Sequence, residues 1–192
     1  MVKGRMEAFS DGVIAIILTI MVLELKVPLG NGWPALRPLI SVFMSYVLSF
    51  IYIGIYWNNH HHMLQAVEKV NGRVLWANLH LLFWLSLVPF ATGWMGENRF
   101  SSLPVALYGV VLFMAGCAFT ILSRSLIASQ GNDFRLAAAL GKDHKGRASI
   151  IIYAVAAPLA FVRPVISCLM YVFVALMWFI PDPRIEHTLS KE

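Results

Sequence analysis

The sequence predicts an all-α integral membrane protein, and three properties of the chain lead to that prediction. Of its 192 residues, 59% are hydrophobic and only 13% are charged, whereas soluble proteins carry about 25% charged residues. The mean hydropathy is +0.71. Charge-free apolar stretches of the length of bilayer helices recur along the chain. We therefore expect a single multi-pass transmembrane domain over residues 1–192, with no soluble domain.

Six apolar stretches follow one another, so we predict six transmembrane helices per subunit. The first includes residues 13–23, which are apolar except for Thr19. It also contains acidic residues and has no small-residue cleavage site, so we do not expect a signal peptide. The last two stretches meet at Arg163 and Pro164, where a charge beside a helix breaker indicates a tight hairpin. The predicted spans are 6–26, 37–59, 73–95, 102–124, 147–162 and 164–181.

The distribution of basic residues predicts the orientation in the cell membrane. If the N-terminus is cytoplasmic, only Lys26, Arg37, Arg99 and Arg163 lie outside. This asymmetry satisfies the positive-inside rule, so we expect both termini in the cytoplasm, together with a linker at 125–146 that includes a short amphipathic helix near 134–140. The net charge of +5 is thereby explained by topology, and no nucleic-acid partner is expected. The inside residues are Lys3, Arg5, Lys69, Arg73, Arg124, Arg135, Lys142, Lys145, Arg147, Arg184 and Lys191.

Charges lie unusually close to the first apolar run. Residues 13–23 rise only about 18 Å as a helix, against a hydrocarbon core of about 30 Å. A membrane span here must therefore include Asp11, together with Glu7 or Glu24. Ionisable residues inside a membrane are costly and face a bundle interior or an aqueous path. The start of the first helix is therefore a candidate functional site.

The same segment carries a sequence signature. Near its start, the chain has Arg5, Phe9, Ser10, Asp11 and Gly12 at the spacing Arg-x-x-x-Phe-Ser-Asp-Gly. Together with residues 13–28, this segment resembles the first helix of bacterial members of the transmembrane protein 175 family, potassium channels of lysosomes and prokaryotes. The resemblance extends over at least residues 5–97, through the stretches 57–61 (Trp-Asn-Asn-His-His), 71–76 (Asn-Gly-Arg-Val-Leu-Trp) and 85–90 (Leu-Ser-Leu-Val-Pro-Phe).

The resemblance implies a function and an assembly. It implies a potassium-permeable channel that also admits other monovalent cations, and neither an enzyme nor a protein with a cofactor or bound metal. Only the first helix of this small subunit carries a suitable stripe, so a pore requires several copies around a symmetry axis. Prokaryotic chains with one repeat look like homotetramers in this family, and this chain has one repeat.

A stripe of apolar residues on the first helix is the candidate pore lining. Ile16, Ile20 and Leu23 follow at spacings of four and three, and Thr19 lies beside them. Taken alone, this periodicity also fits ordinary packing against helices or lipid. The resemblance implies that the three apolar residues form the pore constriction and that Thr19 contributes to selectivity. Apolar rings gate by dewetting, and hydroxyl oxygens partly replace the hydration shell of an ion.

Polar residues of the first helix form a second constellation with the third span. His80 is the only titratable group inside that span, so we expect a network of Arg5, Ser10, Asp11 and His80 beside Phe9. The resemblance implies the same structural role, which positions the pore helix. Removing one member of a buried ion pair costs about 3–5 kcal/mol, so Asp11→Asn is expected to impair folding or assembly. A proton relay is the alternative, because histidine titrates near neutral pH.

Two other classes of function remain open. The first is a proton- or cation-coupled secondary transporter that uses Asp11 and His80, although the sequence shows no internal repeat and no broken helix in its first half. The second is a haem enzyme in which His60 or His61 acts with His80. Adjacent histidines on a helix point about 100° apart, so His60, His61 and His62 are not expected to share one metal ion.

Overall fold

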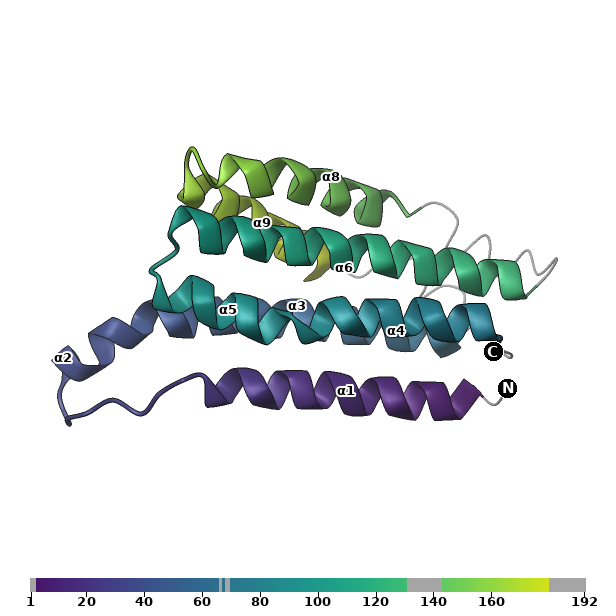
Figure 1. The fold of residues 1–192 in the computed structure, drawn as a ribbon, viewed down its shortest axis with the longest axis horizontal. Coiled ribbons are helices and arrows are strands. Elements are labelled where there is room, and N and C mark those ends of the chain that lie inside the picture. Colours follow the sequence, from purple (N-terminus) through teal and green to yellow (C-terminus); the bar gives the residue numbers. More distant parts are fainter. Residues whose placement is uncertain (1–2, 66, 68–69, 131–142, 180–192) are drawn as a thin grey trace.

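The computed structural model describes residues 3–65, 67, 70–130 and 143–179, and these contain helices and no strands. The long helices run side by side along one axis (Figure 1). This confirms the predicted all-α fold. The elements are α1 (Lys3–Leu23), α2 (Trp33–Leu36), the 3-10 helix η1 (Arg37–Leu39), α3 (Ile40–Gln65), α4 (Gly72–Ser86), α5 (Val88–Glu97), α6 (Ser102–Ser129), α8 (His144–Leu159) and α9 (Pro164–Phe179).

Four of the described helical segments are long and apolar enough to cross a membrane. They are Lys3–Leu23, Trp33–Gln65, Gly72–Glu97 and Ser102–Ser129. Helices α8 and α9 have 16 residues each and rise about 24 Å, less than a hydrocarbon core of about 30 Å. They form the predicted hairpin, in which the Arg163 N–H donates to the Leu159 carbonyl at 2.9 Å. The chain is therefore a multi-pass helical membrane protein.

Several helix ends differ from the hydropathy-based boundaries. Helix α1 ends at Leu23, three residues before the predicted end, and α6 continues to Ser129. Helix α8 begins at His144 because the Asp143 side chain accepts the Gly146 N–H at 2.7 Å, a standard N-cap. The linker is thus shorter than 125–146, because backbone hydrogen bonding continues past the first polar residues. The amphipathic helix predicted near 134–140 lies outside the described residues.

The third predicted span is bent. It comprises α4 and α5, which are separated at Leu87. Pro89 has no N–H to donate to the Leu85 carbonyl, so the regular helical hydrogen bonding stops there. The interruption is one residue long, and Gly72–Glu97 still forms a single helical segment of 26 residues. A kink of this kind is not the unwound helix of a transporter site, so it does not contradict the expectation that the first half contains no broken helix.

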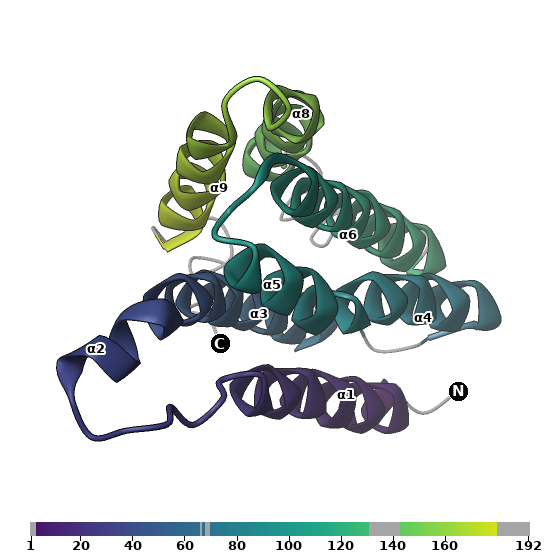
Figure 2. The same cartoon turned by 60° about the vertical axis from the view of Figure 1, so that its left-hand side comes forward.

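The packing places α1 on one side of the bundle. Helix α1 contacts α3, α4 and α5, whereas α8 contacts α6 and α9. Figure 2 shows α1 below the α3–α5 layer and α8 and α9 on its far side. The start of α1 lies at the same end of the bundle as the end of α3, the end of α6 and the start of α8 (Figure 1). Polar groups at these helix ends can therefore meet.

A salt bridge connects the segment that follows α1 to the end of α5. The Lys26 ammonium donates to Glu97 Oε1 at 2.9 Å. This hydrogen bond and the charge of Glu97 raise the pKa of Lys26 above its usual value. Both side chains are exposed, so solvent screens the pair and its contribution to stability is small.

Candidate functional site

Helix α1 turns one face to the bundle and leaves another uncovered. The face toward α3, α4 and α5 contains Met6, Ser10, Ile14, Ile17 and Met21, all of them buried. At about 100° per residue, Ile16, Ile20 and Leu23 fall within an arc of about 60°, and its centre lies roughly 120° from the buried face. The exposed fractions are 58% for Ile16, 42% for Ile20 and 77% for Leu23, against 1% for Ile14, 3% for Ile17 and 1% for Met21.

Thr19 is also exposed, and its hydroxyl is hydrogen-bonded to the helix backbone. Its Oγ1 donates to the Ile16 carbonyl at 2.9 Å. Threonine hydroxyls in helices often bond back to a carbonyl three or four residues earlier, and Thr19 makes a bond of this type. Donation of the hydroxyl proton leaves the two lone pairs of the oxygen available. The back-bond is therefore compatible with cation coordination by Thr19.

A buried polar network joins α1 to α3 and α4. Asn78 Nδ2 donates to Ser10 Oγ at 2.9 Å, and Asn78 Oδ1 lies 2.8 Å from His60 Nε2. Ser10 Oγ in turn donates to the Met6 carbonyl at 2.8 Å. An amide oxygen only accepts, so His60 carries its proton on Nε2. All three side chains are at most 1% exposed, so this network fixes the rotation of α1 against the bundle.

A second set of polar contacts lies at the border of the same interface. Trp57 Nε1 donates to Asp11 Oδ1 at 3.0 Å. His61 Nδ1 lies 3.4 Å from Glu7 Oε1, and its ring stacks on that of Trp57. Trp57 and His61 both belong to α3, whereas Glu7 and Asp11 belong to α1. The acidic residues of the first helix are therefore held by α3.

The predicted network is only partly brought together. Ser10 takes part in a network, but Asp11 instead accepts a hydrogen bond from Trp57. His80 Nε2 accepts a hydrogen bond from Trp84 Nε1 at 3.0 Å. His80 follows Asn78 by two residues, or about 200° around α4, so the two side chains leave the helix on opposite sides. The expected pairing of Asp11 with His80 is therefore absent from the described part of the subunit. Arg5 and Phe9 lie on exposed positions of α1.

Sequence reasoning missed Asn78 and considered His60 as a haem or metal ligand. A signal for Asn78 was present, because an amide inside an apolar span is costly unless another helix satisfies it. The ring nitrogen His60 Nε2 is used by Asn78, and His61 Nε2 lies 2.9 Å from Gln65 Nε2. Among the described residues, no three His, Cys, Asp or Glu side chains are grouped closely enough to hold a metal ion.

Comparison with known proteins identifies the family. The family model for the endosomal/lysosomal potassium channel TMEM175 matches residues 5–89. A potassium channel of Chryseobacterium sp. (strain P1-3) is 54% identical over 191 residues, which cover 100% of both chains. A potassium channel of Streptomyces collinus is 38% identical over 128 residues, 62% of each chain. The endosomal/lysosomal proton channel TMEM175 of Homo sapiens is 32% identical over 101 residues, 46% of this chain and 20% of the human one.

The fold agrees with a solved structure of this family. The crystal structure of a lysosomal potassium-selective channel TMEM175 homolog from Chamaesiphon minutus superposes with a TM-score of 0.75 at 25% sequence identity. The match covers 93% of this chain and 96% of the other. The signature on α1, the relative that matches along the whole length and the shared architecture lead to one conclusion: the chain belongs to the TMEM175 family of potassium channels.

Proposed function

We propose that four copies of the chain surround a common axis and that their α1 helices line a potassium-permeable pore. The supporting observation is the division of α1 into a buried face and an exposed stripe. Ser10 and Asn78 hold one face against the subunit's own bundle, which leaves Ile16 and Ile20 exposed. In closed cyclic symmetry each copy presents the same stripe to the axis.

The apolar part of the stripe forms the constriction in this proposal. Ile16, Ile20 and Leu23 follow one another along one line of the helix, so four copies produce three stacked apolar rings. Water leaves a narrow apolar ring readily, and the ring then blocks ions without any mechanical plug. Other monovalent cations meet the same barrier.

Thr19 supplies the polar layer between these rings. Its hydroxyl proton is engaged with the Ile16 carbonyl, so the oxygen lone pairs of four subunits are available to a partly dehydrated ion. Removing water from sodium costs more free energy than removing it from potassium. A ring of hydroxyl oxygens that coordinates the ion only weakly therefore favours potassium. The end of the bundle that holds the start of α1 faces the cytoplasm in this arrangement, as the positive-inside rule requires.

The decisive experiment compares two asparagine substitutions on the same helix in a liposome potassium-flux assay. Ile20→Asn introduces hydrogen-bonding groups into the constriction, so we expect a higher potassium flux. Val22→Asn is the matched control, because Val22 is exposed to a similar degree and lies about 200° from Ile20 around the helix. Equal flux through both variants, or unchanged flux through Ile20→Asn, contradicts the proposed pore lining.

Selectivity and assembly require two further measurements. Thr19→Ala is expected to reduce the preference for potassium over sodium in bi-ionic reversal potentials, whereas Thr19→Ser retains the hydroxyl and the preference. An unchanged reversal potential for Thr19→Ala would remove the hydroxyl from the selectivity mechanism. Native mass spectrometry should give four times the 21.5 kDa of one chain, and a different multiple would refute the tetramer.

A further inference from the structure

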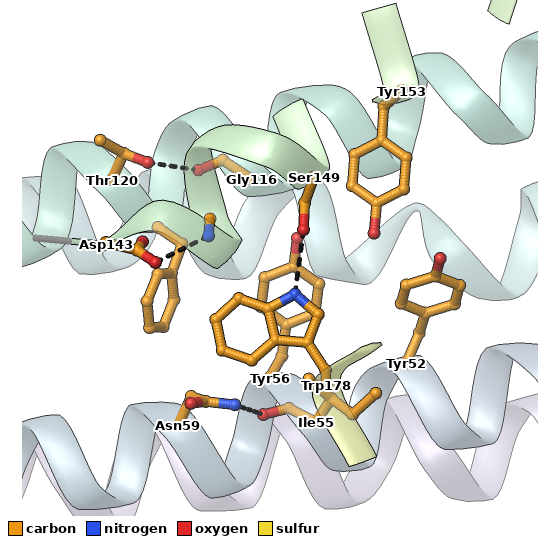
Figure 3. Close-up of a pocket in the computed structure, with 12 residues that line it drawn as sticks. Tyr52, Ile55, Tyr56, Asn59, Gly116, Thr120, Asp143, Ser149, Tyr153 and Trp178 are labelled. Carbon is orange, nitrogen blue, oxygen red and sulfur yellow. Dashed lines mark hydrogen bonds between the residues drawn. The ribbon is translucent and has the colours of Figure 1, made fainter. Parts of the chain in front are cut away.

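A small cavity lies among α3, α6, α8 and α9, apart from the stripe of α1 (Figure 3). Its volume is about 40 Å³. One water needs about 10–15 Å³, so the cavity accommodates about three waters or a molecule of about three heavy atoms. The wall includes Asp143 at the start of α8 and Asn59 near the end of α3. The proposed pore uses none of these residues.

Five aromatic side chains belong to the described part of the wall. They are Tyr52, Tyr56, Phe119, Tyr153 and Trp178. The ring centroids are 6.0 Å apart for Tyr56 and Phe119 and 6.2 Å apart for Tyr52 and Tyr153, and both pairs meet edge to face. The faces of aromatic rings carry partial negative charge and attract cations within about 6 Å of the ring centroid. The rings therefore favour a cation that also has apolar surface.

Four polar side chains of the wall use their donors on other protein groups, and Figure 3 shows three of these contacts. A bound molecule therefore meets oxygen atoms that can accept hydrogen bonds, among them the Asn59 amide oxygen, the Asp143 carboxylate and the tyrosine hydroxyls. Asp143 Oδ1 already accepts the Gly146 N–H at 2.7 Å, and a carboxylate accepts up to about four hydrogen bonds. The internal pairs are Thr120 Oγ1 to the Gly116 carbonyl (3.0 Å), Trp178 Nε1 to Ser149 Oγ (3.0 Å), Ser149 Oγ to the Lys145 carbonyl (2.8 Å) and Asn59 Nδ2 to the Ile55 carbonyl (2.8 Å).

We propose that this cavity binds a small primary alkylammonium ion. The ammonium group donates hydrogen bonds to the Asp143 carboxylate and the Asn59 amide oxygen, and the alkyl group lies among the aromatic rings. No lysine or arginine belongs to the described part of the wall, so the Asp143 carboxylate is its charged group. An anion would face this carboxylate and the ring faces, which repel it. A bare metal ion would lose hydration that so few oxygens do not replace.

The test is a ligand-observed NMR titration of the detergent-solubilised full-length chain with ethylammonium chloride at constant potassium concentration. We expect a Kd on the order of 1 mM, close to the limit for a ligand of three heavy atoms. Ethanol and propionate, which lack the positive charge, should bind at least about tenfold more weakly, because hydrogen bonds to charged groups are roughly twice as strong. Binding of ethanol or propionate as tight as that of ethylammonium would overturn the proposal.

Three variants locate the binding. Asp143→Asn should weaken ethylammonium binding at least about tenfold, because it removes the charge, while asparagine remains a good N-cap for α8. Phe119→Leu should weaken it about threefold by removing one ring face, and it serves independently if Asp143→Asn misfolds. Glu97→Gln, which removes the same charge at an exposed position outside the cavity, should leave the Kd unchanged.

Two outcomes overturn the proposal with these variants. Unchanged binding in Asp143→Asn and Phe119→Leu places the ligand elsewhere. If Ile20→Asn alone abolishes binding, the ammonium ion occupies the stripe of α1. The proposal does not depend on the pore, so its failure leaves the flux and reversal-potential experiments unaffected.

Discussion

Substitution of Asn78 tests whether the buried network holds α1 in place. Asn78→Leu keeps roughly the size of the side chain and removes its hydrogen bonds to Ser10 and His60, of 2.9 and 2.8 Å. Interhelical hydrogen bonds in membrane proteins contribute about 0.6 kcal/mol on average and at most about 1.7. The two bonds together therefore account for about 1–2 kcal/mol of the free energy of unfolding.

The orphaned His60 ring adds to this loss. Its Nδ1 atom is already buried without a hydrogen-bond partner among the described residues, so Asn78→Leu leaves the buried Nε2–H unsatisfied as well. An unsatisfied buried donor costs about 1–3 kcal/mol. Ser10 still donates to the Met6 carbonyl, so it adds little. The expected destabilisation is about 2–5 kcal/mol in total.

Equilibrium unfolding of the purified protein in detergent measures this difference. Asn98→Ala is the matched control, because Asn98 Nδ2 donates to the Trp94 carbonyl at 2.9 Å from an exposed position. We expect that variant to stay within about 0.5 kcal/mol of the wild type. If Asn78→Leu and Asn98→Ala are equally stable, the network does not anchor α1, and the assignment of its buried face loses its main support.

Two further variants test the interfaces of α1 and α5. Asp11→Asn should lower the free energy of unfolding by less than about 1 kcal/mol, because an amide oxygen still accepts the Trp57 Nε1–H. A buried ion pair would instead cost about 3–5 kcal/mol, so a loss of that size in thermal unfolding would support the ion pair originally expected for Asp11. Gly96→Ala should cost about 1–3 kcal/mol, because its Cβ would lie 2.7 Å from the Val42 Cα and would also meet Ser45 Oγ. Gly54→Ala is its control, since a Cβ there meets nothing within 4 Å, and equal stability of the two glycine variants would contradict close packing of α5 on α3.

The amino-acid sequence by itself determined the class of the fold and the residues that share a stripe on α1. Composition and apolar length predicted helices that cross a membrane, and Arg163 with Pro164 predicted the hairpin between α8 and α9. These features are local, because helix formation in lipid is dictated by backbone hydrogen bonding within each segment. The spacing of Ile16, Ile20 and Leu23 likewise follows from helix geometry alone.

Only the tertiary structure decided which way each helix is turned. Lipid and a protein core accept apolar side chains almost equally, so hydropathy does not distinguish the buried face of α1 from its exposed stripe. The same rotation separates Asn78, which meets Ser10 and His60, from His80, which meets Trp84. Polar partners are chosen by the helices packed beside them, since each buried donor or acceptor must find a group within hydrogen-bonding distance. Packing therefore fixed the rotation of each helix, which its own sequence pattern left open.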